Sequence, residues 1–287
     1  MSIVTESEET GLKPTSITVP KTLHKLEDVI SGKAVKPITT GIEDLDRIVQ
    51  ILPSKLIIIC GKSQHGKSVL ANQIGFYNAL YFDKKVAVFN MEMDDTEIIG
   101  RGLSYLAQID NYKFNRLREM TEAEHLKVID KADILSHHNF YIDDSGYQTI
   151  SSIKAKMMKL RQICGLDLVV IDYLQLIKNT THIKRNEQVA EIARDLKLLS
   201  KEFHVPIIAI SSLIKDVQGK PKLSDLKESG DIEYSADIII APYLDYKDNL
   251  EIDSGVASYR VLKNRGGITG EHNIRFNGAY SYFEDWR

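Results

Sequence analysis

The chain has 287 residues, a formal net charge of −3 and 43% hydrophobic residues, values that are ordinary for a globular protein. No apolar run is long enough to form a helix that crosses a bilayer, and the charge balance gives no general attraction to nucleic acid, so any DNA binding has to come from local basic loops. The two cysteines, Cys60 and Cys164, lie in apolar stretches. This favours buried thiols over a disulfide and predicts a reducing, cytoplasmic compartment without a membrane partner.

The N-terminal segment differs in composition from the rest of the chain. The first 20 residues are polar and contain two prolines, which predicts an extended arm. Residues 21–31 have the spacing of a short amphipathic helix, with apolar side chains at Leu23, Leu26, Val29 and Ile30. Such a short helix is marginal unless it packs on its own domain or on a neighbouring subunit. We therefore expect an arm and docking helix in residues 1–35 and one large domain in residues 36–287.

After Thr40 the pattern alternates between apolar strands and helices. Strands are expected at 56–60, 85–90, 139–142, 166–171, 206–211, 236–240, 257–262 and 272–276. Helices are expected at 42–49, 67–80, 95–108, 121–135, 149–163 and 187–203. Several strands are apolar throughout, which is typical of a parallel sheet covered on both faces. The predicted fold class is α/β, with a mostly parallel twisted sheet flanked by helices and a ligand outside the carboxyl ends of the strands.

A phosphate-binding pattern follows the first of these strands. Residues 61–68 read Gly-Lys-Ser-Gln-His-Gly-Lys-Ser, which is G-x-x-x-x-G-K-S between a strand and a helix. The backbone of such a loop can surround phosphate oxygens, Lys67 can reach the β- and γ-phosphates, and Ser68 can bind Mg²⁺. The predicted nucleotide-binding residues are Gly61, Lys62, Ser63, Gln64, His65, Gly66, Lys67 and Ser68. A plain glycine turn is the alternative, but the flanking segments favour the nucleotide site.

Two carboxylates follow apolar strands and are candidates for the chemistry. Asp172 comes directly after the strand at 166–171, where a carboxylate can hold Mg²⁺ or cap the next turn; beside a P-loop we favour the metal role. Glu92 lies just past the strand at 85–90. It can polarise an attacking water, or it can be a surface charge near a helix start, and the residues alone leave both interpretations open.

Basic residues gather in two further places. Lys263 and Arg265 project to one side of a strand end and could stabilise charge on a phosphoryl group, but the glycine pair that follows suits a hairpin turn. The residues alone favour the turn. Loops at the carboxyl edge of the sheet carry cations that could follow a DNA backbone, namely Lys184, Arg185, Lys215 and Lys227. Ordinary surface charges would give the same pattern, since no aromatic residue is interleaved for base stacking.

Together these segments resemble the C-terminal RecA-like ATPase domain of DnaB-type replicative DNA helicases, from about Lys21 to the C-terminus. The segment Ile171-Asp172-Tyr173-Leu174-Gln175-Leu176 is identical to the family's I-D-Y-L-Q-L. Residues 224–230 resemble its S-D-L-R-E-S-G region, with Lys227 in place of the arginine. Residues 90–93 and 263–265 are similar to its S-L-E-M and K-x-R segments.

The resemblance implies roles that the residues alone leave open. It implies an ATP- and Mg²⁺-dependent motor, a homo-hexameric ring that travels on single-stranded DNA, and primase, helicase-loader or other replisome partners in a bacterial or phage-infected cell. Glu92 becomes the catalytic glutamate, and Arg265, beside Lys263, becomes a finger in a neighbour's ATP site. The 21–31 helix becomes a linker helix that packs on the adjacent subunit. The loop that lines the ring channel contains Lys227, Glu228 and Gly230.

Besides Lys227, two further departures accompany the resemblance. Ser212 stands where the family usually has a glutamine, which implies that γ-phosphate sensing falls to another group or is lost. Family members carry an N-terminal helical domain, whereas only a short arm precedes the linker helix here, so we expect a minimal helicase. Two alternatives stay open: a RecA- or RadA-like recombination ATPase that forms filaments on DNA, and a module that loads or inhibits a host helicase.

Overall fold

The computed structural model describes residues 12–32, 37–114, 116–178, 185–213, 217, 219–226, 229–248, 252 and 255–286. The chain divides into two compact units, Met1–Pro37 and Ile38–Arg287, and each is considered by itself. None of the helices in the described part of the chain is long and apolar enough to cross a membrane.

Helix α2 of the first unit spans Thr15–Ile30, so the prediction of an extended arm was wrong for residues 15–20. The helix begins because the backbone N–H groups of Ile17 and Thr18 donate to the Pro14 carbonyl, at 3.0 and 3.2 Å. Pro20 lies inside the helix. A proline this close to the amino end removes one backbone hydrogen bond, and the helix continues past it.

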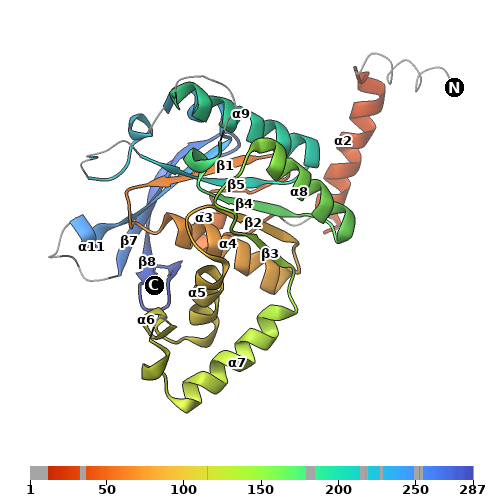
Figure 1. Ribbon diagram of the computed structural model, residues 1–287. Helices are drawn as coiled ribbons and strands as arrows, with labels where there is room; N and C mark the ends of the chain where they lie inside the picture. The colour runs from red at the N-terminus through yellow and green to blue at the C-terminus, as the bar shows by residue number, and fades with distance from the viewer. Residues whose placement is uncertain are drawn as a thin grey trace. The chain divides into compact units, whose positions relative to one another are not determined.

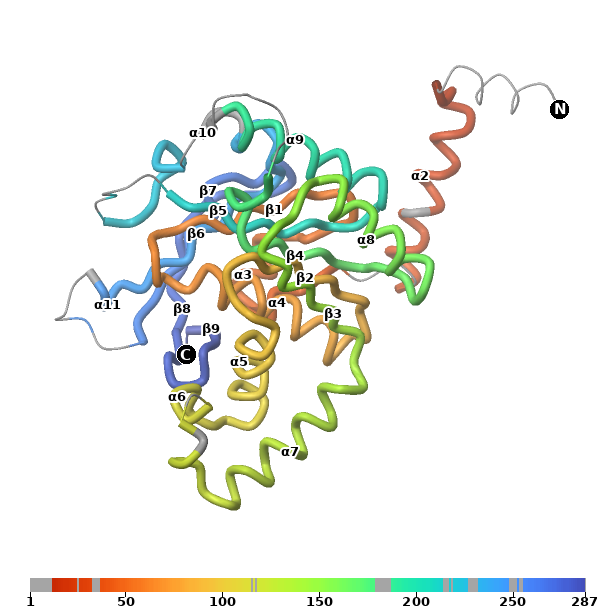
Figure 2. The backbone as a smooth tube through the Cα atoms, in the orientation of Figure 1, coloured from red at the N-terminus to blue at the C-terminus, as the bar shows by residue number. Residues whose placement is uncertain are grey.

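In the described part of the second unit, nine strands form one sheet in the order β3-β2-β4-β5-β1-β6-β7-β8-β9. Figures 1 and 2 together label these strands. Their bounds are β1 Leu56–Gly61, β2 Val86–Asn90, β3 Phe140–Asp143, β4 Leu168–Asp172, β5 Ile207–Ser212, β6 Ile238–Leu244, β7 Val256–Asn264, β8 Gly270–Asn277 and β9 Tyr282–Asp285. The strands from β3 to β6 in this order pair in parallel, and the last three are antiparallel. The predicted α/β class with a mostly parallel sheet is confirmed, and β9 is an additional strand.

The helices are α3 Glu43–Asp46, α4 Lys67–Phe82, α5 Asp95–Ala107, α6 Asn111–Phe114, α7 Glu122–Ser136, α8 Ile150–Ile163, α9 Arg185–Phe203, α10 Ser229–Ser235 and α11 Asp245–Asp248, with short 3-10 turns at Leu117–Glu119, Leu174–Leu176 and Leu223–Asp225. The helix expected at 42–49 is only the single turn α3. Turn bonds continue it, since the Val49 N–H donates to the Leu45 carbonyl at 2.8 Å, and the Ile48 carbonyl accepts from the Asn264 side chain at 3.0 Å.

Helices cover both faces of the sheet, with α8 and α9 on one side and α4 on the other (Figures 1 and 2). Strand β1 shows why its residues are apolar throughout. Leu56, Ile58 and Cys60 belong to the core cluster that includes α8 and α9, whereas Ile57 and Ile59 belong to the cluster that includes α4. Since successive side chains of a strand point to opposite faces, both faces of β1 are buried.

The register of the strands decides which segments share an edge of the sheet. Gly61 pairs with Ser212 and Asn90 with Asp172, so the ends of β1, β5, β2 and β4 meet at the carboxyl edge. At the amino edge, the last residue of β7, Asn264, pairs with Ile238. The turn between β7 and β8 therefore lies at the edge opposite the 61–68 loop.

Candidate nucleotide-binding site

The loop at 61–66 leaves β1 and enters α4 with a geometry that requires glycine at its last position. Gly66 has φ +81°, and a Cβ placed there would lie 2.5 Å from the Phe283 ring. Lys67 is the first residue of α4, so the loop delivers the helix N-terminus to the carboxyl edge of the sheet. Free N–H groups and a partial positive charge at such a terminus favour phosphate.

The loop borders a cavity of about 810 Å³ at this edge. Its lining includes seven of the eight predicted loop residues: Gly61, Lys62, Ser63, Gln64, Gly66, Lys67 and Ser68. Glu92, Asp172 and Ser212 also line it, which brings together side chains from four different strand ends. Val69 and Phe276 contribute apolar side chains to the cavity wall. The size and mixed lining suit a nucleotide-sized ligand.

His65, the eighth predicted loop residue, is buried and anchors the loop. Its Nδ1 accepts a hydrogen bond from the Leu244 backbone N–H at 3.0 Å, and its ring stacks on Tyr243 with centroids 5.0 Å apart. These contacts tie the tip of the loop to the end of β6. The structure therefore places His65 as a support of the loop and not in the cavity lining.

Lys67 reaches back across its own loop. Its Nζ donates to the Lys62 carbonyl at 2.8 Å. Burial lowers the pKa of Lys67, while the carboxylates of Asp172 and Glu92 oppose that change. A bound triphosphate would supply stronger acceptors for this ammonium than one backbone carbonyl does.

Asp172 has the environment of a cation ligand. It is 1% exposed, and neither carboxylate oxygen has a hydrogen-bond partner among the described residues. Burial raises its pKa from an ordinary 3.8 to about 6; the nearby Ser68 side chain, Lys67 and Arg101 oppose the rise, and Glu92 adds to it. No three His, Cys, Asp or Glu side chains converge into a metal cage within the described ranges. Mg²⁺ commonly uses one or two protein oxygens together with phosphates, so Asp172 and the Ser68 hydroxyl fit this ion.

The backbone that carries Glu92 is held by its neighbours. The Asn90 Oδ1 accepts from the backbone N–H groups of Glu92 and Met93, at 2.9 and 2.8 Å. The Met91 N–H donates to the Asp172 carbonyl at 2.8 Å. Because these bonds fix the turn after β2 against β4, the Glu92 carboxylate is presented to the cavity beside Asp172.

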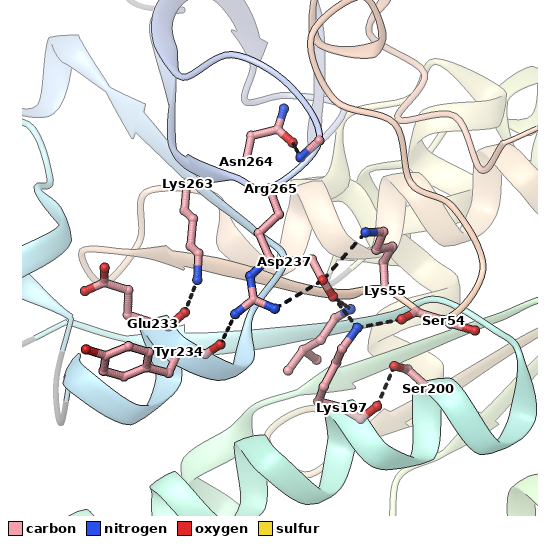
Figure 3. A network of polar contacts seen from close by, with 12 residues as sticks. Ser54, Lys55, Lys197, Ser200, Glu233, Tyr234, Asp237, Lys263, Asn264 and Arg265 are labelled. Carbon is pink, nitrogen blue, oxygen red and sulfur yellow. Dashed lines mark hydrogen bonds and ion pairs between the residues drawn. The ribbon is translucent and has the colours of Figure 1, made fainter. Parts of the chain in front are cut away.

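Lys263 and Arg265 are not near the cavity of their own chain. The Arg265 N–H donates to the Asp237 carbonyl at 2.9 Å, and the Asp237 N–H donates to the carbonyl of Leu56, the first residue of β1, also at 2.9 Å. The pair thus lies at the amino edge of the sheet, beside the C-terminal turn of α10 (Figure 3). A second cavity of about 350 Å³ borders Arg265 there.

A family model for the DnaB-like helicase C terminal domain matches residues 37–285. The chain belongs to the family of DnaB-like helicase C-terminal domains. The replicative DNA helicase DnaB of Haemophilus influenzae is 35% identical over 273 residues, which cover 92% of this chain and 58% of that protein. The replicative DNA helicase DnaC of Bacillus subtilis is 34% identical over 269 residues, covering 91% and 58%. The chain therefore spans less than two thirds of the length of these relatives.

Solved structures of similar proteins share the fold. One solved ATPase domain superposes with a TM-score of 0.85 and 28% identity, covering 94% of this chain and 99% of that chain. A DnaB-like replicative helicase whose structure was described with its interactions with primase gives a TM-score of 0.84 and 27% identity, covering 93% and 66%. The expected resemblance and RecA-like architecture are thereby confirmed.

Arg101 is a cavity residue of this DnaB-like domain that the sequence analysis missed. It comes from α5, lines the cavity, and its Nη2 lies 2.8 Å from Glu97 Oε1. The sequence offered one signal for this residue, a cation in the helix after the Glu92 turn. The spacing of Arg101 from Glu97, however, fits an ordinary i,i+4 ion pair on a helix surface equally well.

The Ser212 departure has a local consequence. The Gln175 side chain donates to Ser211 Oγ at 3.0 Å and accepts from the Ser212 N–H at 3.4 Å. The amide of Gln175 therefore binds the end of β5 from the neighbouring strand connection. Ser212 lines the cavity with a short hydroxyl side chain.

Four of the six predicted DNA-binding residues lie outside the described residues: Lys184, Lys215, Lys227 and Glu228. Arg185 is the first residue of α9, and Gly230 is the second residue of α10.

Replacing Asp172 with asparagine should stabilise the protein in the absence of nucleotide and Mg²⁺. A buried acid whose pKa is raised to about 6 stabilises the fold when protonated, and that stability, about 3 kcal/mol, is lost as the pH rises from about 4 through 6. We expect the melting temperature of Asp172→Asn to exceed that of the wild type at pH 7.5, and the difference to shrink toward pH 4.5. With Mg²⁺ and ATP the wild type should gain more than the variant. A lower melting temperature for the ligand-free variant at pH 7.5 would contradict the argument that the buried Asp172 charge destabilises the fold.

Proposed function

We propose that this chain is an ATP-driven DNA helicase motor of the replicative type, which works as a ring of identical subunits. The observation that carries the proposal is the division of hydrolytic groups between the two edges of the sheet. Lys67, Asp172 and Glu92 converge on the cavity at the carboxyl edge, whereas Arg265 lies at the amino edge. A complete site therefore needs the carboxyl edge of one subunit and the amino edge of the next.

The residues around the cavity have complementary tasks in this proposal. The loop backbone and Lys67 bind the phosphates, and Glu92 accepts a proton from the attacking water. Ser68 and Asp172 would hold Mg²⁺, which neutralises phosphate charge when it is bound. Arg101 is the group in the cavity best suited to recognise the γ-phosphate, because its guanidinium has the reach and charge that Ser212 lacks.

The remaining surfaces are assigned in the same proposal. Helix α2 packs on the adjacent subunit through its apolar face, which contains Leu23, Leu26 and Val29. Single-stranded DNA follows the segment that contains Lys227, Glu228 and Gly230, and it also contacts Lys184, Arg185 and Lys215. One relative has been described with its interactions with primase, which supports primase as a partner of this chain. A helicase loader and other replisome proteins are further partners in the proposal. Such a motor acts in the cytoplasm, at the nucleoid.

The first test is an ATPase assay of the purified chain with and without single-stranded DNA, followed by unwinding of a forked duplex. We expect Mg²⁺-dependent turnover that DNA stimulates, ring-shaped particles, and unwinding. Lys67→Ala should abolish hydrolysis with an unchanged circular dichroism spectrum, because the lysine acts on phosphates. Filaments on DNA without unwinding would favour a recombination ATPase, and a folded chain without ATPase activity would favour a loader or inhibitor module.

A further inference from the structure

Asp237, at the amino edge of the sheet, is a buried charge that the proposed mechanism has not yet used. Its side chain is 4% exposed, and it directly precedes β6. Its Oδ2 accepts from the Leu56 backbone N–H at 2.8 Å and from Lys197 Nζ at 2.6 Å. Lys197 also donates to the Ser54 carbonyl at 2.7 Å, so this oxygen joins α9 to the start of the P-loop strand β1 (Figure 3).

The other carboxylate oxygen faces two further cations. Lys55 Nζ lies 3.7 Å from Oδ1, and Arg265 Nη1 lies 3.8 Å from it. The two oxygens therefore differ in their contacts: Oδ2 binds the framework, and Oδ1 faces the guanidinium. An ion pair of 3.8 Å is long for a hydrogen bond, so it orients Arg265 without saturating its donors.

The C-terminal turn of α10 supplies the other contacts of the cation pair. Arg265 donates to the Tyr234 carbonyl, and Lys263 donates to the Glu233 carbonyl (Figure 3). Carbonyls at the end of a helix have no partner within the helix and attract cations. Arg265 is thus held between these carbonyls and the Asp237 carboxylate, while its side chain stays 46% exposed.

Asp237 keeps its negative charge at neutral pH. Burial alone would raise its pKa, but the hydrogen bonds from Lys197 and the Leu56 N–H, with the charges of Lys197 and Lys55, leave the pKa below its ordinary value. The carboxylate therefore attracts the guanidinium throughout the pH range around neutrality.

We propose that Asp237 is a positioning residue for Arg265: its buried carboxylate fixes the guanidinium at the amino edge of the sheet and ties it to the P-loop strand and α9 of the same subunit. This inference rests on the proposed role of Arg265 in the ATP site of a neighbouring subunit. A long, half-exposed arginine samples many rotamers. Holding its side chain in one orientation beforehand means that this conformational entropy is not lost at the moment of reaction. Oδ2 is bonded to β1 through the Leu56 N–H. A shift of β1 in one subunit would therefore also move Asp237, and with it the Arg265 that acts at the ATP site of the next subunit.

The test compares three variants for ATP turnover and for nucleotide affinity. Asp237→Asn removes the charge, and Asp237→Asn with Lys197→Met also removes the buried ammonium that would otherwise lose its partner. Lys197→Met alone is the matched control, because it removes the bond from α9 to Oδ2 and leaves the carboxylate beside the Leu56 N–H, Lys55 and Arg265. We expect kcat of the double variant to fall about 100-fold with an unchanged Kd for ATP. Turnover of Lys197→Met should stay within about 3-fold of wild type. Thermal melts show that each variant is folded.

A second measurement separates positioning from damage to the variant's own nucleotide site. The double variant keeps an intact P-loop, and a Lys67→Ala chain keeps an intact Arg265 and Asp237. Mixing the two should recover turnover to the extent that a mixture of Arg265→Ala with Lys67→Ala does. Equal loss of kcat in the double variant and in Lys197→Met, or a weakened Kd for ATP without recovery on mixing, would overturn the inference. If Arg265→Ala alone retains full turnover, the proposed function of that arginine fails, which is a separate result.

Discussion

Replacing Glu92 with glutamine should leave nucleotide binding intact and lower ATP turnover by about 10²- to 10⁴-fold, the range for loss of a general base. The substitution is nearly isosteric, and the turn that carries residue 92 is fixed by Asn90 and by the Asp172 carbonyl. The amide would thus occupy the same position in the cavity but could not accept the proton of an attacking water. Single-turnover hydrolysis at saturating ATP separates this loss from any change in binding.

The control for this prediction is Glu202→Gln. Glu202 pairs with Lys154 on the outer side of α8 and α9 and is 51% exposed, so this variant removes one carboxylate far from the cavity. Its turnover should match the wild type. If Glu92→Gln also matches the wild type, Glu92 is a surface charge, and another group orients the water.

The sequence indicated most of the cavity because its parts follow apolar strands. Asp172 ends β4 itself, Glu92 follows β2 by two residues, and the 61–68 loop follows β1. In a parallel sheet such ends share one edge, so local patterns were enough to predict that these side chains meet. The structure shows that these side chains line one cavity. Their catalytic roles remain predictions.

The features that the sequence did not indicate depend on contacts between distant segments. Strand β9 is held by Gln73 of α4, whose side chain binds both backbone groups of Phe283, at 2.7 and 2.8 Å. The network around Asp237 joins β1, α9, β6 and the β7–β8 turn. No periodicity within one segment can report such pairings, and the Ala236-Asp237 segment reads as an ordinary strand start.

The two interpretations of the Lys263–Gly267 segment are not exclusive. The glycine pair does lie in the turn between β7 and β8, and that turn places Arg265 at the amino edge. What the residues alone could not decide is whether another subunit's phosphates reach the arginine. Arg265 and the nucleotide cavity of the same chain lie at opposite edges of the sheet. The fold therefore does not let Arg265 contact phosphates bound by its own subunit.

Arg265→Ala should bind ATP with unchanged affinity and lose most of its turnover. An arginine that stabilises the transferring phosphoryl group contributes on the order of 10³- to 10⁵-fold in rate. Arg47→Ala is the matched control, because Arg47 is an exposed arginine that borders the same cavity at the amino edge and pairs with Glu43. If ATP turnover needed only positive charge at this edge and not Arg265 itself, Arg47→Ala and Arg265→Ala would lose activity to the same extent. We expect only Arg265→Ala to lose it.

The decisive form of this experiment mixes Arg265→Ala chains with Lys67→Ala chains, each inactive by itself. In a mixed ring, some interfaces pair the intact P-loop of an Arg265→Ala chain with the intact Arg265 of a Lys67→Ala neighbour. Those interfaces contain every group of the proposed site, so part of the turnover should return, provided that subunits exchange and that hydrolysis at one interface does not require all of them. An arginine that served its own subunit's phosphates would restore nothing, since neither chain then carries both groups. Full turnover of Arg265→Ala by itself would refute the assignment and leave the Lys263–Gly267 segment as a turn between two strands.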